Sequence, residues 1–293
     1  MTSEETGDTL DREEGWMDTS HDRMVLSVDN MANWADNFFG NPLSDLESSA
    51  SSLIRIRPQF EWDEKNDTDW TLRATGRLHL PRVNERLNLV FFSDDGDFED
   101  EFYDPAMVSD GSSTLGLQYE VEQKKHSRIT AFAGIKSGFK GKLGGRYRYQ
   151  RPFWERNRFT FSEALFWVGG DGFGTLTRMD IDRKLDRSLL LRWANKMEYS
   201  EESNGAEWNS RIALIKRLDD KSAVRGFTFI RGETSPQLLQ SRGFGFAYRR
   251  NFMRDWLYWE VEPRYAWRKQ KAHKEREGVA SIRLRLEILF SNG

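Results

Sequence analysis

The stretch GVASIRLRLEILF (278–290) decides which fold class this sequence belongs to. Its apolar side chains recur at every second position, and polar or charged side chains fill most of the positions between them. The apolar set is Ala280, Ile282, Leu284, Leu286, Ile288 and Phe290, and the polar set is Ser281, Arg283, Arg285 and Glu287. This period of two predicts a β-strand with one apolar and one charged face. Such a strand fits either the edge of a soluble sandwich or the closing strand of a barrel whose apolar face meets lipid.

The composition narrows the class of protein. The chain has 293 residues, of which 38% are hydrophobic and 31% are charged. It contains no run of about 18 apolar residues, so a transmembrane helix is excluded. It has no cysteine, which excludes disulfides and thiolate metal sites. The opening residues MTSEETGDTL carry neither the basic nor the apolar segment of a signal peptide, so an exported form would already have lost one.

The charge is distributed unevenly along the chain. Twelve acidic and two basic residues give the first 50 residues a net charge of −10, whereas the remaining residues carry +7. Within the acidic part, apolar residues at helical spacing predict an amphipathic helix over 24–39. These residues are Met24, Val28, Met31, Ala35 and Phe38. We therefore expect two units, an acidic N-terminal arm over 1–52 and a β-rich unit over 53–290.

From residue 53 onward, alternation predicts fourteen antiparallel strands, with twelve as the alternative count. The predicted strands are 53–62, 69–80, 86–93, 114–123, 128–137, 141–151, 157–168, 173–183, 188–199, 207–217, 222–231, 242–250, 255–268 and 278–290. Most are longer than the roughly five to six residues usual in soluble proteins. They match the roughly 9–11 residues that a tilted strand needs to cross a bilayer. Strand length therefore favours an all-β barrel that spans a membrane.

Two further patterns agree with a membrane barrel. Short connections alternate with a more variable set whose longest member is 94–113, and such an alternation is typical of outer-membrane barrels. Aromatic residues gather at both sets of strand ends, where the wall of a barrel meets the headgroup layers. They are Trp62, Trp70, Trp167, Phe173, Tyr199, Trp208 and Trp267 beside the variable loops, and Phe153, Trp154, Phe159, Phe252, Trp256 and Phe290 near the short turns.

With these features, residues 53–290 resemble the Gram-negative outer-membrane β-barrel class, porin-like and of about fourteen strands. The last strand ends on Phe290 and resembles the assembly signal that the barrel insertion machinery reads, although three residues follow the aromatic here. The resemblance implies an up-and-down barrel in the bacterial outer membrane. It also implies contact of the wall with outer-membrane lipids and lipopolysaccharide.

The polar faces of the predicted strands supply the candidate functional residues. They carry more basic than acidic side chains, and rings of Arg and Lys in a pore favour anions. The arginines proposed to line the lumen and bind solute are Arg55, Arg57, Arg73, Arg77, Arg146, Arg148, Arg178, Arg192, Arg264, Arg283 and Arg285. The alternative is that these residues pair with carboxylates in a ladder that fills a narrow barrel.

The arm and the loop 94–113 are two candidate restrictions of such a lumen. The helix 24–39 is expected to plug the barrel, to pack on its rim or to bind a periplasmic protein. The residues expected to make these contacts are Met31, Trp34, Phe38 and Phe39. The loop contains eight acidic residues and no basic one, so it is a constriction, a divalent-cation ligand or a solvated surface loop. Its acidic residues lack the spacing of a calcium loop, and we predict no metal site.

Other functions have less support in the sequence. An outer-membrane hydrolase needs a base beside a nucleophile, and His79 and His273 are the histidines that a test would change. No cofactor is expected, and nucleic-acid binding is not supported because the basic residues alternate with apolar ones. The sequence therefore predicts a channel for small polar, anionic solutes. The alternative is a non-conducting scaffold or assembly barrel that binds a periplasmic partner through the N-terminal helix.

Overall fold

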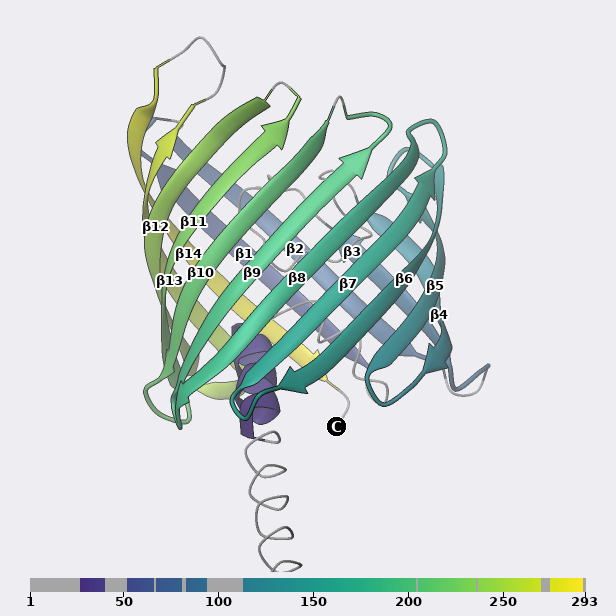
Figure 1. Ribbon diagram of the computed structural model, residues 1–293, viewed down its shortest axis with the longest axis horizontal. Coiled ribbons are helices and arrows are strands. Elements are labelled where there is room, and N and C mark those ends of the chain that lie inside the picture. Colours follow the sequence, from purple (N-terminus) through teal and green to yellow (C-terminus); the bar gives the residue numbers. More distant parts are fainter. Residues whose placement is uncertain are drawn as a thin grey trace, which may run out of the picture.

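The computed structural model describes residues 27–39, 52–65, 67–80, 83–93, 113–203, 205–235, 237–269 and 275–291. These residues form one closed barrel of antiparallel strands and a helix at 27–39 (Figure 1). The strands are β1 (Leu53–Asp63), β2 (Asp67–His79), β3 (Leu87–Ser93), β4 (Thr114–Gln123), β5 (Ser127–Lys136), β6 (Lys140–Phe153), β7 (Asn157–Val168), β8 (Gly172–Asp186), β9 (Leu189–Ser200), β10 (Ala206–Arg217), β11 (Ser222–Thr234), β12 (Gln237–Phe252), β13 (Arg254–Arg268) and β14 (Glu277–Ser291). No helix within the described ranges is long and apolar enough to cross a membrane.

Each strand pairs with its neighbour in the sequence, and β1 pairs with β14 to close the ring. The closing ladder is antiparallel and runs from Leu53 opposite Ser291 to Asp63 opposite Ser281. The prediction of an up-and-down barrel with fourteen strands, not twelve, is confirmed. The largest difference in boundary is at β12, which begins at Gln237, five residues before its predicted start.

The barrel reverses the burial pattern of a soluble protein. On β14, Arg283 and Glu287 are 2% and 0% exposed, whereas Leu284 and Leu286 are 46% and 38% exposed. A soluble protein would bury the leucines, because a contiguous exposed apolar surface is rare in a monomer. A hydrocarbon environment removes that conflict, and the closed ladder satisfies the backbone polar groups that lipid cannot. The apolar face of the last strand is therefore the face that meets lipid.

Exposed aromatic side chains lie at both ends of the wall, as predicted. Trp70 and Phe173 are 72% and 64% exposed at the end that carries the loops. Trp154 and Trp256 are 77% and 48% exposed at the opposite end. Aromatic side chains are favoured at the two levels where hydrocarbon gives way to headgroups, Trp in particular because its ring has one apolar and one polar side.

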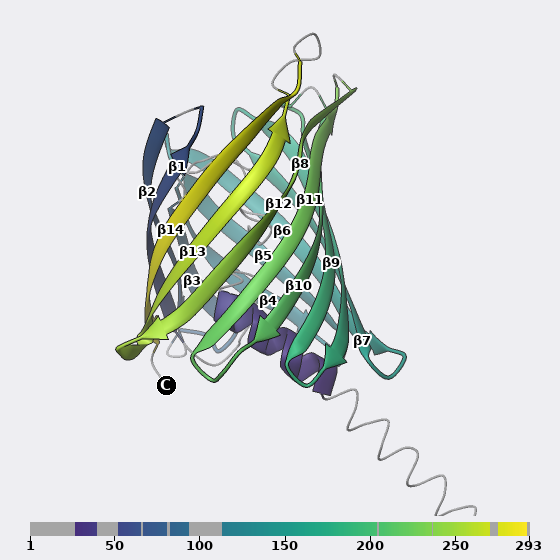
Figure 2. The same ribbon diagram turned by 90° about the vertical axis from the view of Figure 1, so that its left-hand side faces the viewer.

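One end of the barrel, which we call the terminal mouth, carries the start of β1 and the end of β14. Figures 1 and 2 show the helix 27–39 at this mouth, running across it within the ring of strands. At the opposite end, only the connections 94–113 and 269–276 are long; the others, such as 201–205, have five residues or fewer. The expected contrast between short turns and longer loops therefore rests on two connections only.

A lipid-facing wall makes a testable prediction. Ile212 lies on the outward face near the middle of β10 and is 48% exposed. Ile212→Arg is expected to destabilise the barrel in lipid vesicles by about 2–4 kcal/mol, because it places a guanidinium near the bilayer midplane. Val83→Arg, in the connection between β2 and β3, is expected to change stability by about 0.5 kcal/mol or less. Denaturant unfolding from vesicles measures both variants, and equal effects would contradict the orientation of the wall.

Candidate functional site in the barrel lumen

The inward wall of the barrel is strongly basic. Among the described residues, it buries sixteen Arg or Lys side chains and six Asp or Glu side chains. The basic residues are Arg55, Arg57, Arg73, Arg77, Lys136, Lys142, Arg146, Arg158, Arg178, Arg192, Lys196, Arg211, Arg225, Arg249, Arg283 and Arg285. The acidic residues are Asp63, Asp180, Asp182, Glu260, Glu262 and Glu287. Because buried charges require partners, this wall is a set of ion-pair networks with a basic surplus.

All eleven arginines predicted to face the lumen lie on the inward face. Nine of them are buried, and Arg148 and Arg264 are half-buried. The structure divides the set into three groups. Arg55, Arg57, Arg264, Arg283 and Arg285 gather beside the β1–β14 junction, Arg148 and Arg192 lie near the helix, and Arg73, Arg77, Arg146 and Arg178 lie on β2, β6 and β8. Whether these residues bind solute stays a prediction.

Strand register places opposite charges across the closing junction. On β13 and β14, Glu260 lies directly opposite Arg285, and Glu262 lies directly opposite Arg283. On the other side of β14, Arg283 lies opposite Glu61 of β1. Because side chains on one face of a sheet recur every second residue, this one register aligns a whole row of pairs.

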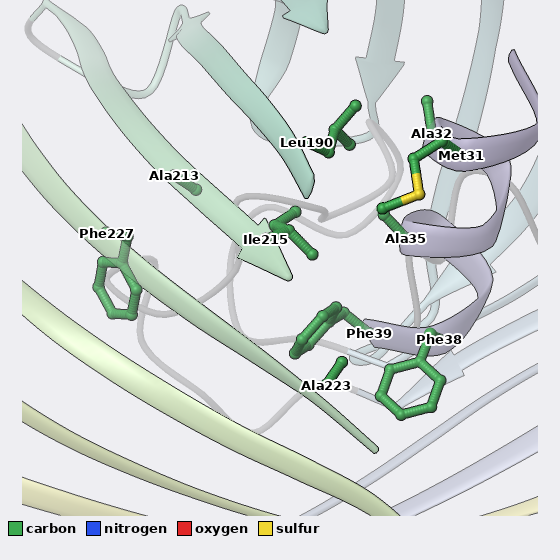
Figure 3. Close-up of a cluster of buried hydrophobic side chains, with 10 residues drawn as sticks. All are labelled: Met31, Ala32, Ala35, Phe38, Phe39, Leu190, Ala213, Ile215, Ala223 and Phe227. Carbon is green, nitrogen blue, oxygen red and sulfur yellow. The ribbon is translucent and has the colours of Figure 1, made fainter. Parts of the chain in front are cut away.

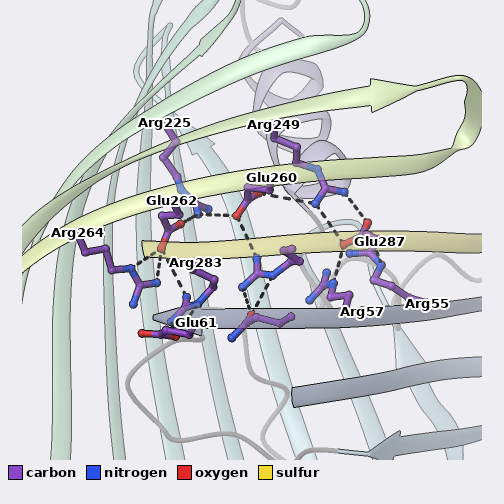
Figure 4. Close-up of polar contacts among 12 residues, drawn as sticks. Arg55, Arg57, Glu61, Arg225, Arg249, Glu260, Glu262, Arg264, Arg283 and Glu287 are labelled. Atoms are coloured by element: carbon purple, nitrogen blue, oxygen red, sulfur yellow. Dashed lines mark hydrogen bonds and ion pairs between the residues drawn. The ribbon is translucent and has the colours of Figure 1, made fainter. Parts of the chain in front are cut away.

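Each of three buried glutamates contacts three arginines (Figure 4). Glu287 lies 2.5 Å from a guanidinium nitrogen of Arg249, 2.6 Å from Arg57 and 3.7 Å from Arg55. These partners come from β12 and β1, so Glu287 links strands on both sides of β14. The charge-assisted contacts join the first and last strands inside the barrel.

Glu260 and Glu262 repeat this arrangement on β13. Glu260 lies 3.1 Å from Arg285, 3.7 Å from Arg249 and 3.8 Å from Arg225. Glu262 lies 2.6 Å from Arg225 and also contacts Arg264 and Arg283. Since every carboxylate serves several guanidiniums, the network remains positive overall while each glutamate is well compensated.

The helix 27–39 packs its apolar face on an apolar area of the lumen wall near the terminal mouth (Figure 3). The helix residues in this cluster are Met31, Ala32, Ala35, Phe38 and Phe39, and the wall residues are Leu190, Ala213, Ile215, Ala223 and Phe227. These wall positions face inward, where the rest of the barrel places mostly polar side chains. Full burial of a Leu, Ile, Met or Phe side chain contributes about 1.5–3 kcal/mol. Contact between the two apolar surfaces therefore stabilises the helix in the mouth.

Arginines of the wall hold the aromatic side chains of the helix. The guanidinium of Arg217 lies 4.1 Å from the ring centroid of Trp34, and that of Arg225 lies 4.7 Å from that of Phe39. Phe38 packs edge-on against Tyr258 of β13, with ring centroids 5.7 Å apart. Cations over aromatic faces add to the attraction, most strongly where water is excluded. The helix residues predicted to make contacts thus contact the barrel itself.

A buried carboxylate on the helix completes the attachment. Asp36 is 4% exposed and contacts Arg192 at 2.5 Å and Arg158 at 3.2 Å. Arg158 also donates a hydrogen bond of 2.7 Å to the side-chain oxygen of Asn33. At the start of the helix, the ammonium of Lys184 donates a hydrogen bond to the hydroxyl of Ser27. The contacts reach from β7 to β13, so the helix extends across about half of the ring.

The environment of Asp36 favours its charged form. Burial by itself would raise the pKa of this carboxyl, but the positive charges of Arg192 and Arg158 outweigh burial and lower the pKa below 3.8. The guanidinium of Arg148 acts in the same direction. Asp36 is therefore ionised while the helix lies in the mouth.

Three members of these networks were missed in the sequence. Arg158 sits at the start of β7 in phase with the inward Thr160 and Ser162, and that phase is the signal that could have found it. Arg225 lies on a strand with no clearly polar face in the sequence. Asp36 could not be assigned a partner, because Arg158 and Arg192 are more than 120 residues away along the chain.

Two of the four histidines, His79 and His126, lie within the described residues. His79 shares a 3.2 Å hydrogen bond with the side-chain oxygen of Asn88, and His126 lies 3.2 Å from the carbonyl oxygen of Gln150. His273 and all of the predicted constriction 94–113 except Ser113 lie outside the described residues. No group of His, Asp or Glu side chains within the described ranges is arranged to hold a metal ion.

The three-arginine contact of Glu287 predicts a large effect on stability. Glu287→Gln leaves buried guanidiniums without their carboxylate, and we expect a loss of about 3–5 kcal/mol in the free energy of unfolding. The matched control is Glu277→Gln on the same strand, where Glu277 lies 3.7 Å from Lys65 and both side chains are more than half exposed. Its expected effect is about 0–1 kcal/mol. Denaturant unfolding compares the two, and a small loss for Glu287→Gln would show that the network is not needed for closure.

The lowered pKa of Asp36 predicts how attachment of the helix depends on pH. A carboxyl whose pKa falls on docking stabilises the docked state above its ordinary value of 3.8, and this stabilisation is lost as pH falls further. We therefore expect a spin label on Asn30→Cys, the only cysteine in the chain, to stay immobile from about pH 8 to 5 and to become mobile in stronger acid. Asp36→Asn should remove this component of the transition, and an unchanged profile would contradict the assignment.

No protein-family model matches the chain, and no curated protein sequence matches it. Solved structures of outer-membrane proteins are similar to it in fold. The outer membrane channel DcaP of Acinetobacter baumannii is 8% identical with a TM-score of 0.51, covering 83% of this chain and 99% of that chain. OmpT of Vibrio cholerae is 9% identical with a TM-score of 0.45, covering 84% and 99%. An anion-selective porin from Comamonas acidovorans is 8% identical with a TM-score of 0.49, covering 82% and 100%. The closed ring, the apolar outer wall and the similarity to DcaP agree: the chain has the fold of a bacterial outer-membrane β-barrel.

Proposed function

We propose that this barrel is an outer-membrane channel for the passive passage of small polar, anionic solutes, restricted at its terminal mouth by the N-terminal helix. The surplus of sixteen buried basic over six buried acidic side chains on the inward wall carries the proposal. Fixed positive charge lowers the electrostatic cost of a negative solute and raises that of a positive one. The same surplus would serve no purpose in a barrel that only needs to be filled, since matched pairs would fill it at lower cost.

The side of the restriction follows from the general topology of such barrels. Short turns of outer-membrane barrels face the periplasm, so the terminal mouth and its helix are assigned to the periplasmic side. The helix lies across this mouth, and its attachment combines apolar packing with the Asp36 ion pairs. A lumen cavity between β10 and β14, lined by residues such as Asn209 and Arg268, has a volume of about 10 Å³. That is room for about one water.

The similarity to DcaP supports a channel in general, since that protein is described as an outer membrane channel. The loop 94–113 remains a second proposed constriction, because its acidic side chains would be attracted by a basic lumen. The passing solute and the surrounding lipid and lipopolysaccharide are the proposed partners. Recognition of the Phe290 strand by the insertion machinery stays a prediction.

The alternative of a non-conducting scaffold has a specific requirement. It needs Met31, Trp34, Phe38 and Phe39 to be available to a periplasmic protein. In the structure, three of these side chains are buried against the barrel and Trp34 is half-buried beneath Arg217. A partner would therefore have to displace the helix from the mouth before it could bind this face.

Conductance across planar bilayers tests the proposal. We expect the full chain to conduct weakly, and Asp36→Ala and a variant lacking residues 1–50 to conduct more, with reversal potentials in a salt gradient that favour anions. Loss of charge-assisted contacts shifts the docked equilibrium by about 10–100-fold.

Arg146→Gln is expected to reduce the preference for anions. Asp171→Ala, which removes a carboxylate that contacts Lys136 and Lys140 near the opposite end, is the control for opening. If all variants are silent, the lumen is a filled ladder and the scaffold alternative is favoured.

A further inference from the structure

We infer that Arg158 and Arg192 form a carboxylate-binding site for the solute, and that Asp36 occupies this site in the closed state as an internal substitute for the solute's carboxylate. The inference rests on the proposed channel function, and it adds the class of solute and the residues that select it. It also implies that solute and helix compete for one position.

The geometry around Asp36 is that of a ligand in a site. Each carboxylate oxygen contacts a different arginine, with Oδ1 at 2.5 Å from Nη1 of Arg192 and Oδ2 at 3.2 Å from Nη2 of Arg158. Both guanidiniums belong to the wall, and Asp36 belongs to a helix that is separated from the barrel by a chain segment. The wall therefore supplies a receptor for one carboxylate, and the helix supplies the occupant.

Asp182 orients the two arginines from the wall side. Its Oδ1 accepts a hydrogen bond of 2.6 Å from Nε of Arg192, and its Oδ2 accepts one of 2.8 Å from Nη2 of Arg158. Asp182 is 0% exposed and lies on β8, between the strands that carry the two arginines. Its register partners are Arg158 on one side and Arg192 on the other. We call these three residues the triad; the sheet fixes their positions, and the helix does not. Guanidiniums held in place lose little freedom when an external carboxylate binds.

The triad carries a net positive charge, which favours the binding of an anion. Two arginines and one aspartate are positive together, and Arg148 adds further positive potential at the position of Asp36. The site also lies at the mouth, where a solute entering or leaving the basic lumen has to pass. A carboxylate matches two separate guanidinium contacts through its two oxygens, so a carboxylated solute is the class that this site fits best.

Competition between the solute and Asp36 would couple binding to opening. A tethered carboxylate acts at a high effective concentration, so only a solute abundant near the mouth displaces it. Displacement of Asp36 removes the ion pairs of the helix and leaves only apolar and cation–aromatic contacts to hold it in the mouth. The site would thus weaken the closed state in the presence of the solutes that the channel carries.

A binding experiment tests this site without relying on conduction. Sodium acetate is the probe, because it carries the same carboxylate as the Asp36 side chain, and acetamide is the neutral control. In detergent, acetate is expected to raise the unfolding temperature of full-length Asp36→Ala, in which the site is vacant. The apparent affinity should be at least about tenfold higher than in the wild type or in Asp36→Ala/Arg192→Gln, as expected for loss of one charge-assisted contact. In the chain that retains Asp36, a spin label on Asn30→Cys should become mobile only at high acetate.

The possible results separate the site from the channel. Stabilisation of Asp36→Ala by acetate but not acetamide, lost with Arg192→Gln, supports the site. Equal stabilisation by inorganic phosphate would overturn the selectivity for carboxylates. No stabilisation of a folded Asp36→Ala overturns the site, even if the variant conducts anions and the channel function stands. Acetate binding by a protein that never conducts would instead retain the site and reject the channel.

Discussion

The hydrogen-bonded ladder between β1 and β14 is the constraint on which the rest of this structure depends. A membrane-spanning sheet with a free edge would leave backbone groups unsatisfied in hydrocarbon, so the first and last strands must meet. Their register aligns Glu61 with Arg283 and Gln59 with Arg285 inside the barrel. Closure therefore fixes which charges face each other across the junction.

Closure also decides what the lumen has to contain. Because the apolar side chains are directed to lipid, the alternate positions bring charged side chains into an enclosed space where each needs compensation. The glutamates Glu260, Glu262 and Glu287 meet this need by contacting several arginines each, and the acidic residues remain outnumbered. A stable wall and a positive lumen thus come from the same residues.

The helix 27–39 lies in the terminal mouth of this lumen and belongs to the same chain. Both the N-terminal end of β1 and the short turns lie at the terminal mouth, so a segment preceding β1 is tethered beside the opening that it enters. Its apolar face meets Leu190 and Ile215, and its carboxylate Asp36 meets two arginines already positioned by Asp182. The proposed competition depends on the separation of these two attachments, because a solute would compete for one of them while the other retains the helix nearby.

The period of two in 278–290, the strand lengths and the aromatic strand ends determined the barrel and its lipid-facing side, because lipid imposes that pattern on each strand separately. They left fourteen or twelve strands open, and the closed ring of the structure decided for fourteen. The same pattern placed eleven arginines on the inward face. It did not show that Glu287 joins Arg57 to Arg249, or that Asp36 reaches Arg158 and Arg192, because alternation gives the face of a residue and not its partner. Only the closed register and the return of the helix to the terminal mouth decided those contacts, since they depend on which distant strands share one small enclosed volume.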